Sequence, residues 1–331
     1  MGMLPRWLHP IRRFWHRIVE RFGRHAGRPD APTVPPRAPF GADGGLIEGR
    51  FGVAEPRRYL LYQPASPPPG PMPLLVLLHG CRQTADDFAR STGMNEAAEA
   101  AGVAVLYPEQ SLNANLLRCW NWYALQDRSY AEGEATLLAA LTRRIVRELG
   151  LDATRVYVAG MSAGGAMAAV LARDYPDLYA ALGVHSGLPA GEAHDMHSAM
   201  QLMSKGPGPP TTPADPAQSA DLAVARIVFH GDGDTTVHPA NAAALHAAPG
   251  VADELSSPSV QVTTPARDGR RAYTRSIEYG PAGVPQRELW IVHGAGHAWA
   301  GGDATARHTD AEGPDASREM LRFFLQHRRA T

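Results

Sequence analysis

Short apolar runs alternate along this chain with longer segments that repeat apolar residues at helical spacing. The short runs are typical of strands buried on both faces of a sheet, and they cover residues 74–78, 103–107, 155–159, 180–184, 226–229 and 288–292. A further strand is predicted at 58–63 and a peripheral hairpin at 261–264 and 272–279. The longer segments predict helices over residues 94–101, 134–149, 163–173 and 314–327. Together they predict an α/β fold, with a mostly parallel central sheet flanked by helices on both faces.

The beginning of the chain follows a different pattern. Residues 1–25 predict a basic amphipathic helix with Pro10 in its first turn. Its apolar face consists of Ile11, Phe14, Trp15, Ile18, Val19 and Phe22. Residues 26–45 are rich in proline and glycine and predict a linker, so we expect the folded domain over 46–328. Residues 10–24 are suited to an anionic membrane or lipid-coated particle, or to docking on the folded domain or a partner subunit.

A Gly-x-Ser-x-Gly pentapeptide stands where one predicted strand meets the helix that follows it. It consists of Gly160, Ser162 and Gly164 with their neighbours, and Gly165 comes next. A strand, a sharp turn and a helix are the context of a nucleophile elbow, in which small neighbours leave room for a strained turn. The turn exposes the serine at a helix N-terminus, which favours developing negative charge. Ser162 is therefore the predicted nucleophile.

A serine nucleophile needs a base, and the base needs an orienting acid. In a doubly wound sheet these groups come from loops at the carboxyl ends of strands. One such loop carries Asp232 and Asp234. We choose Asp234 as the acid, because Asp232 is closer to the strand end and is expected to brace the turn. A later glycine-rich loop carries His293 and His297. His297 is the predicted base because it lies further out, and His293 is expected to be structural.

The tetrahedral intermediate of acyl transfer also needs N–H donors for its oxyanion. We expect them from the backbone of Ala163, directly after the nucleophile, and of Cys81, in a His-Gly-Cys loop after a strand. Three tryptophans are candidates for an apolar wall against the substrate, with simple packing as the alternative. They are Trp120, Trp122 and Trp299.

Composition narrows the classes of function. The chain has 331 residues, 44% of them hydrophobic, and a net charge of −1, so no bias toward nucleic acid is expected. Positive charge is concentrated in residues 1–29, which hold seven arginines and one glutamate. Cys81 and Cys119 are the only cysteines, and a pair cannot supply a structural zinc site alone. They form one disulfide or remain two buried thiols, and their places beside the predicted site favour the bridge. No metal or cofactor is expected.

Several longer stretches resemble the polyhydroxybutyrate (PHB) depolymerase family of α/β-hydrolase esterases, a group that also resembles feruloyl and acetyl-xylan esterases. They are residues 78–88, 107–110, 119–122, 158–167, 183–189, 229–232 and 292–299. The resemblance implies an α/β-hydrolase fold over about 46–328 and a catalytic triad of Ser162, Asp234 and His297. It also implies that the pair Cys81 and Cys119 is often bridged.

The expected function is therefore that of a serine esterase that cleaves poly- or oligo(3-hydroxybutyrate), or similar short-acyl esters, through an acyl-enzyme. A feruloyl or acetyl-xylan esterase is the alternative enzyme. A catalytically decayed protein that binds a granule or membrane surface is the alternative without activity. No apolar run approaches the roughly 20 residues of a transmembrane helix, and no secretory signal is visible. We expect a cytoplasmic protein, peripheral to a granule or membrane, with an extracellular location as the alternative.

Overall fold

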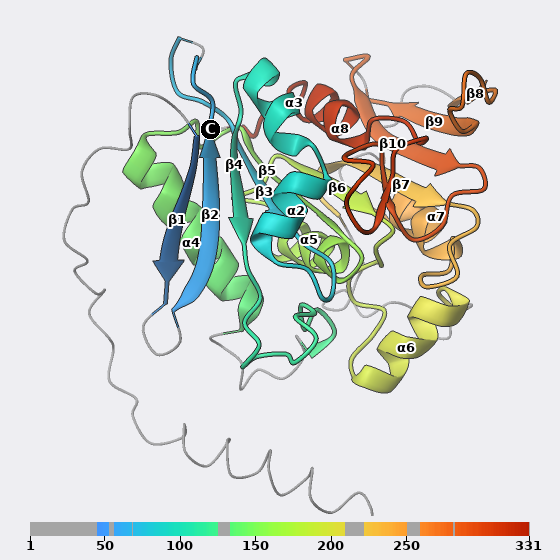
Figure 1. Cartoon of the computed structure of the whole chain (residues 1–331), viewed down its shortest axis with the longest axis horizontal. Helices are drawn as coiled ribbons and strands as arrows, with labels where there is room; N and C mark the ends of the chain where they lie inside the picture. The colour runs from blue at the N-terminus through green and yellow to red at the C-terminus, as the bar shows by residue number, and fades with distance from the viewer. Residues whose placement is uncertain are drawn as a thin grey trace, which may run out of the picture. The chain divides into compact units, whose positions relative to one another are not determined.

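A ten-stranded sheet forms the centre of the structure (Figure 1). The structure is a computed structural model that describes residues 45–52, 56–67, 69–124, 133–208, 222–249, 259–280 and 282–330. The predicted N-terminal helix and linker lie outside the described residues, apart from the last linker position. No helix within these ranges is both long and apolar enough to cross a membrane.

Six neighbouring strands of the sheet run parallel, and antiparallel strands border them on both sides. The strand order is β1-β2-β4-β3-β5-β6-β7-β10-β9-β8, with the parallel part from β4 to β10. The bounds are β1 Gly45–Phe51, β2 Arg57–Gln63, β3 Leu74–Leu78, β4 Ala104–Pro108, β5 Val156–Met161, β6 Ala181–His185, β7 Ala225–Gly231, β8 Val260–Thr264, β9 Tyr273–Tyr279 and β10 Pro285–Val292. Two short strands, β11 Trp299–Ala300 and β12 Thr309–Asp310, pair separately.

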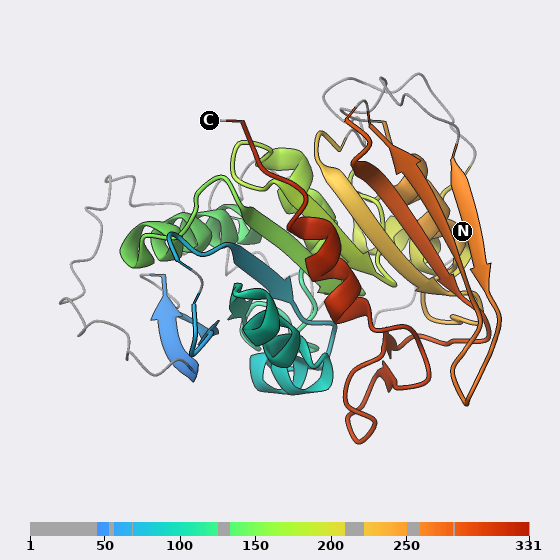
Figure 2. The same ribbon diagram turned by 90° about the horizontal axis from the view of Figure 1, so that it is seen from above.

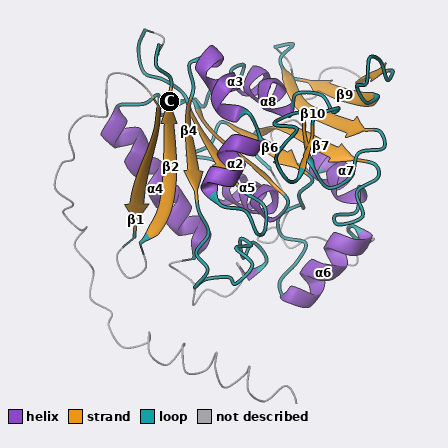
Figure 3. Cartoon of the chain, viewed as in Figure 1, coloured by secondary structure: helices purple, strands orange, loops and turns teal. Residues whose placement is uncertain are grey.

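Helices cover both faces of the sheet (Figure 2, Figure 3). The bounds are α2 Ala85–Ser91, α3 Met94–Ala101, α4 Glu134–Leu149, α5 Ala163–Asp174, α6 Met196–Lys205, α7 Ala240–Ala247 and α8 Ala316–Phe324. In Figure 2, α2, α3 and α8 lie on one face, and α4 and α5 lie on the other. This is the α/β arrangement that the alternation of apolar runs predicts, and it agrees with the α/β-hydrolase fold that the family resemblance implies.

The parallel strands are apolar along their length because both faces of the sheet are covered. Every residue of β3, β4, β5, β6 and β7 is buried. One core cluster joins the sheet to α8, where Tyr157 of β5 stacks on Phe324 with ring centroids 5.1 Å apart. The parallel strands therefore form a closely packed core, and the loops that leave their carboxyl ends meet at one edge of the sheet.

Candidate active site

Ser162 lies in a strained turn between β5 and α5. Its backbone has φ 56° and ψ −123°, outside the regions that ordinary residues prefer. Serine at a helix N-cap usually accepts a hydrogen bond from the first turn, but Ser162 makes no such capping bond. Its hydroxyl is therefore available at the helix N-terminus, where the peptide dipoles favour negative charge. This is the geometry of the predicted nucleophile elbow.

Two glycines allow this turn, because the backbone passes close to other segments. A Cβ atom on Gly160 would collide with the backbone of Gly164, and one on Gly164 would collide with the carbonyl oxygen of Leu78. The helix can thus begin directly against the end of β3. Larger residues at either position would push the serine away from its place.

Asp234 and His297 are hydrogen-bonded to each other. The His297 Nδ1 lies 2.7 Å from the Asp234 Oδ2. Because a carboxylate only accepts, Nδ1 is the donor, and Nε2 is left to face a nucleophile. The other carboxylate oxygen accepts the amides of Thr236 and Val237, at 2.8 and 2.9 Å. Three hydrogen bonds therefore hold this buried carboxylate in one orientation.

A second histidine also faces Asp234. The Nε2 of His230 donates to the carbonyl oxygen of Val237 at 2.9 Å and lies 3.4 Å from the Asp234 Oδ2. Burial raises the pKa of Asp234, but the nearby His230 N–H, the hydrogen bond and charge of His297 and the Val237 amide together hold it well below its usual range. Asp234 is therefore an anion at neutral pH, as the partner of an imidazolium must be.

His297 follows β10, three places from β5 in the sheet, so its loop must reach back toward Ser162. Neighbouring strands are about 4.8 Å apart, which makes this distance about 14 Å. The loop contains Gly294, Gly296 and Gly301, and it approaches β7 so closely that a Cβ atom on Gly231 would collide with its backbone. Within the described residues, no hydrogen bond joins the Ser162 hydroxyl to His297; such bonds often tighten only when substrate binds.

The two expected oxyanion donors border the serine. A Cβ atom built on Gly80 would lie 3.6 Å from the Cβ of Ser162, so the loop with Cys81 packs directly against this serine. In the described part of the chain, neither the Cys81 N–H nor the Ala163 N–H donates to another protein group. Two unused donors next to a serine are what an oxyanion requires.

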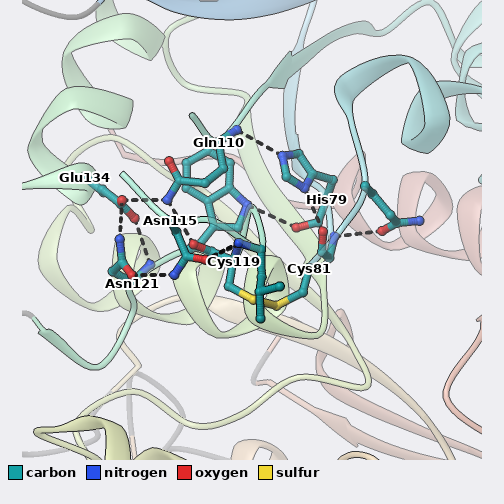
Figure 4. The surroundings of a disulfide bond; sticks show 11 residues. His79, Cys81, Gln110, Asn115, Cys119, Asn121 and Glu134 are labelled. Atoms are coloured by element: carbon teal, nitrogen blue, oxygen red, sulfur yellow. Dashed lines mark hydrogen bonds between the residues drawn. A yellow bond between two sulfur atoms is a disulfide. The ribbon is translucent and has the colours of Figure 1, made fainter. Parts of the chain in front are cut away.

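A network that the sequence did not reveal braces the Cys81 loop (Figure 4). A disulfide joins Cys81 to Cys119, so the predicted bridge is present. The His79 Nε2 accepts the Gln110 amide at 3.0 Å, which places the proton on Nδ1, where it donates to the Gly80 carbonyl at 2.8 Å. Burial lowers the pKa of His79 to about 4 and keeps this ring neutral.

Residues on the far side of the disulfide complete this network. The Gln110 side chain donates to the Cys119 carbonyl at 3.0 Å and to Glu134 of α4 at 2.6 Å. The Trp120 indole donates to the His79 carbonyl at 3.0 Å. The 107–110 and 119–122 stretches are thus next to the site. Neither stretch contains a predicted catalytic residue.

The tryptophan prediction is wrong for two of its three residues. Trp120 is 1% exposed and Trp299 is 0% exposed, so neither can contact a substrate. Trp120 braces the Cys81 loop, and Trp299 packs on Phe88 while its indole donates to Ser317. Trp122, which is 5% exposed, keeps a small accessible surface, and its contact with substrate stays a prediction.

The remaining residues of the two loops have structural partners. Asp232 accepts the Gly294 amide at 2.6 Å and pairs with the His293 Nδ1 at 2.8 Å. The other ring nitrogen of His293 lies 2.9 Å from the Thr274 hydroxyl. This pair ties the turn after β7 to the start of the His297 loop. In the described residues, no cluster of three or more His, Cys, Asp or Glu side chains could hold a metal ion.

The fold and this site define an α/β-hydrolase. Residues 57–264 match the family model described as Esterase PHB depolymerase, which covers more than half of the chain. The chain therefore belongs to the PHB depolymerase esterase family, as the sequence motifs predicted.

Curated relatives agree with this assignment. The poly(3-hydroxyalkanoate) depolymerase C of Paucimonas lemoignei is 31% identical over 240 residues, which are 69% of this chain and 55% of the relative. The poly(3-hydroxybutyrate) depolymerase of Ralstonia pickettii is 32% identical over 205 residues, 55% of this chain and 40% of that protein. Acetylxylan esterase A of Emericella nidulans is 29% identical over 181 residues, 51% of this chain and 58% of the relative. The chain thus spans about half the length of these relatives.

A solved structure supports the fold. An acetyl xylan esterase from Aspergillus awamori superposes with a TM-score of 0.59 at 19% identity, over 85% of this chain and 99% of that one. At this identity the likeness concerns the fold alone.

Proposed function

We propose that this protein is a serine carboxylic-ester hydrolase with Ser162 as nucleophile, His297 as base and Asp234 as orienting acid. The observation that carries the proposal is the 2.7 Å hydrogen bond between His297 and Asp234 at the same sheet edge as the strained, uncapped Ser162. Membership of an esterase family supports the same chemistry.

The reaction follows from these positions. The His297 Nε2 takes the proton of the Ser162 hydroxyl as the serine oxygen attacks the ester carbonyl. The N–H groups of Cys81 and Ala163 stabilise the oxyanion, and Asp234 stabilises the imidazolium. The carbon–oxygen bond to the leaving alcohol then breaks, and His297 returns the proton to that alcohol. Water, activated by the same histidine, releases the acid from the acyl-enzyme.

Exposed apolar side chains at the site's edge support a hydrophobic polyester or oligoester as substrate. Leu112, Leu116 and Leu117 are exposed in the loop after β4, and Leu116 reaches 87%. Met196 and Met200 are exposed on α6. Figure 1 shows this loop and α6 at the edge where the parallel strands end. Exposed apolar groups around a site are suited to a water-poor surface. The depolymerase relatives carry polyhydroxyalkanoate names, which supports the same substrate class.

An esterase that removes acyl groups from polysaccharide is the second candidate. It is favoured by the relatives named acetylxylan esterase A. Both candidates use the same triad, so substrate preference alone separates them.

The test compares wild type with Ser162→Ala on amorphous PHB, the soluble 3-hydroxybutyrate trimer, acetylated xylan and methyl ferulate. Serine-dependent release of 3-hydroxybutyrate is the expected result. Activity confined to acetylated xylan or ferulate would establish the second candidate. No serine-dependent hydrolysis of any of the four would overturn the proposed function.

The apolar edge has its own test. The double variant Leu116→Ser, Leu117→Ser should lower hydrolysis of PHB particles several-fold and leave hydrolysis of the soluble trimer unchanged. Leu325→Ser, at the end of α8, is the matched control for loss of an exposed leucine. If the double variant hydrolyses PHB particles as fast as Leu325→Ser does, the exposed leucines do not contribute to polymer binding.

Residues 10–24 carry the further proposal of contact with a granule or lipid surface. Its support is the basic amphipathic pattern alone. Deleting residues 1–25 should weaken binding to anionic vesicles and PHB granules without changing trimer hydrolysis.

A further inference from the structure

His185 joins the strand that leads to the nucleophile with the strand that leads to the acid. It ends β6, which lies between β5 and β7. Its carbonyl oxygen accepts the Ser162 amide at 2.9 Å, and the next residue, Ser186, donates its amide to Phe229 of β7 at 2.9 Å. The backbone at this point thus fixes the elbow relative to β7.

The His185 side chain, which is 1% exposed, contacts the loop that carries His297. Its Nε2 lies 2.9 Å from the Ala300 amide nitrogen, three residues after His297. The ring stacks on Trp299, with centroids 5.0 Å apart and planes at 25°, and on Phe229 at 5.8 Å and 9°. One imidazole therefore contacts the loop that carries the base.

The hydrogen bonds determine the state of this ring. A backbone amide can only donate, so Nε2 must be an unprotonated acceptor, and the proton is on Nδ1, which lies 3.1 Å from the Ser186 hydroxyl. Burial, helped by the charges of His230 and His297, lowers the pKa of His185 to about 3. The ring is therefore a neutral acceptor at neutral pH, and with Nε2 occupied by the Ala300 amide it cannot serve as a second base.

The loop needs such an acceptor, because its glycines would otherwise leave it many conformations. Among the hydrogen bonds that tie the backbone of this loop to the parallel strands and the turns after them, one lies on each side of His297. The Gly233 amide donates to the Ala295 carbonyl at 3.0 Å, on one side, and the Ala300 amide donates to His185 on the other. His297 lies between these two fixed points.

We propose that His185 is a positioning residue that holds the loop at Ala300 so that His297 faces Ser162 in the transition state. This inference rests on the proposed ester hydrolysis. Misplacing a catalytic group by about 1 Å costs about 10²-fold in rate, so loss of this contact should act on kcat and leave KM nearly unchanged.

Two substitutions separate the hydrogen bond from the packing of the ring. His185→Phe keeps an aromatic ring between Trp299 and Phe229 but leaves the Ala300 amide without an acceptor. His185→Gln loses the ring but places an amide oxygen near the former Nε2. We expect kcat for the soluble trimer to fall about 10- to 100-fold in His185→Phe, with KM within about threefold. His185→Gln should recover most of this loss.

His327→Phe is the matched control, because His327 is also buried and packs on an aromatic ring, that of Phe323, outside the site. It should change stability but not kcat. If wild type itself shows no serine-dependent hydrolysis, the proposed function fails. If wild type is active and His185→Phe stays within twofold of its kcat, or if Phe and Gln lose kcat equally, the His185 proposal alone is overturned.

A measurement on the unaltered protein covers the case in which His185→Phe does not fold. An N–H···N hydrogen bond transmits a scalar coupling between its two nitrogens, which NMR detects in ¹⁵N-labelled protein. We expect a coupling between the Ala300 amide nitrogen and the His185 Nε2, present from pH 5 to pH 9. A His185 ring protonated on Nε2 in this range would overturn the proposal.

Discussion

Two aspartates stand two positions apart in the loop after β7 and have different partners. Asp234 is buried and accepts from His297 and from two amides. Asp232 is more exposed and holds His293 and the Gly294 amide. The same functional group is therefore a buried partner of His297, the proposed base, in one place and a brace for a turn in the other. Burial and partners, and not residue type, assign the two roles.

Replacing each aspartate by asparagine tests this division. Asp234→Asn keeps the shape, but its amide would present a donor to His297 Nδ1 and so favour the wrong tautomer. We expect kcat to fall about 10³- to 10⁴-fold. Asp232→Asn should lower kcat less than about tenfold. Steady-state kinetics on the soluble trimer measures both, and a larger loss for Asp232→Asn would reverse the assignment.

Residue type and position in the chain were enough to place Ser162, Asp234 and His297 at one sheet edge, because the carboxyl ends of parallel strands must meet there. Residue type and position were not enough to predict that Trp120 and Trp299 are buried. A tryptophan in a loop has the same local signal whether it faces substrate or core, and its direction depends on partners far along the chain, such as the His79 carbonyl. His185 was missed for the same reason, since its partner Ala300 is 115 residues away.

At the scale of elements, the buried strands, the long helices and the peripheral hairpin were predictable, and several short elements were not. The predicted strands over 74–78 and 155–159 and the hairpin match β3, β5 and the β8–β9 pair. Strand β1 was missed because none of its residues is buried, so it lacks an apolar signal. Helix α7 was missed because its alanine-rich sequence has no amphipathic pattern. Helix α6 was not predicted either.

The disulfide connects the loop after β3 with the loop after β4. It closes a segment with a sequence separation of 38. Replacing both cysteines by alanine should lower the free energy of unfolding by about 2–4 kcal/mol. Because the hydrogen bonds that the side chains of Gln83, His79 and Trp120 make still hold the loop, kcat should fall less than about tenfold. Denaturant titration of both proteins measures the first effect, and equal midpoints and slopes would contradict it.

For the domain over residues 45–330, the sheet order explains why distant segments form one site. Ser162 follows β5, Asp234 follows β7 and the glycine-rich loop of His297 follows β10. His185, on the strand between the first two, contacts all three regions through its backbone, ring and Nε2. The family's esterase name and this arrangement agree.

The stability of the whole domain should depend on pH through three buried histidines. Burial lowers the pKa of His79 and His327 to about 4 and that of His185 to about 3. The unfolded chain binds protons on these residues near pH 6.5, and the folded chain does not. The stability that neutral burial contributes is therefore present above pH 6.5 and is lost as the pH falls toward 4.

The slope of this loss is measurable. Each histidine contributes up to about 1.4 kcal/mol per pH unit, so the free energy of unfolding should fall by up to about 4 kcal/mol per unit between pH 6 and pH 5. Urea unfolding at pH 7.5, 6 and 5 gives the slope. His327→Phe should reduce it by about one third, and a slope that stays flat below pH 6 would refute the neutral burial of these rings.

The central claim is that Ser162 is the nucleophile of an ester hydrolase, and covalent labelling tests it most directly. A fluorophosphonate reacts with an activated serine, and mass spectrometry of the peptides locates the label. We predict one label per molecule, on Ser162, with trimer hydrolysis lost in proportion to labelling. Ser162→Ala should remain unlabelled and lose hydrolysis by about 10³-fold or more. A label on another residue, or substantial hydrolysis by Ser162→Ala, would contradict the account.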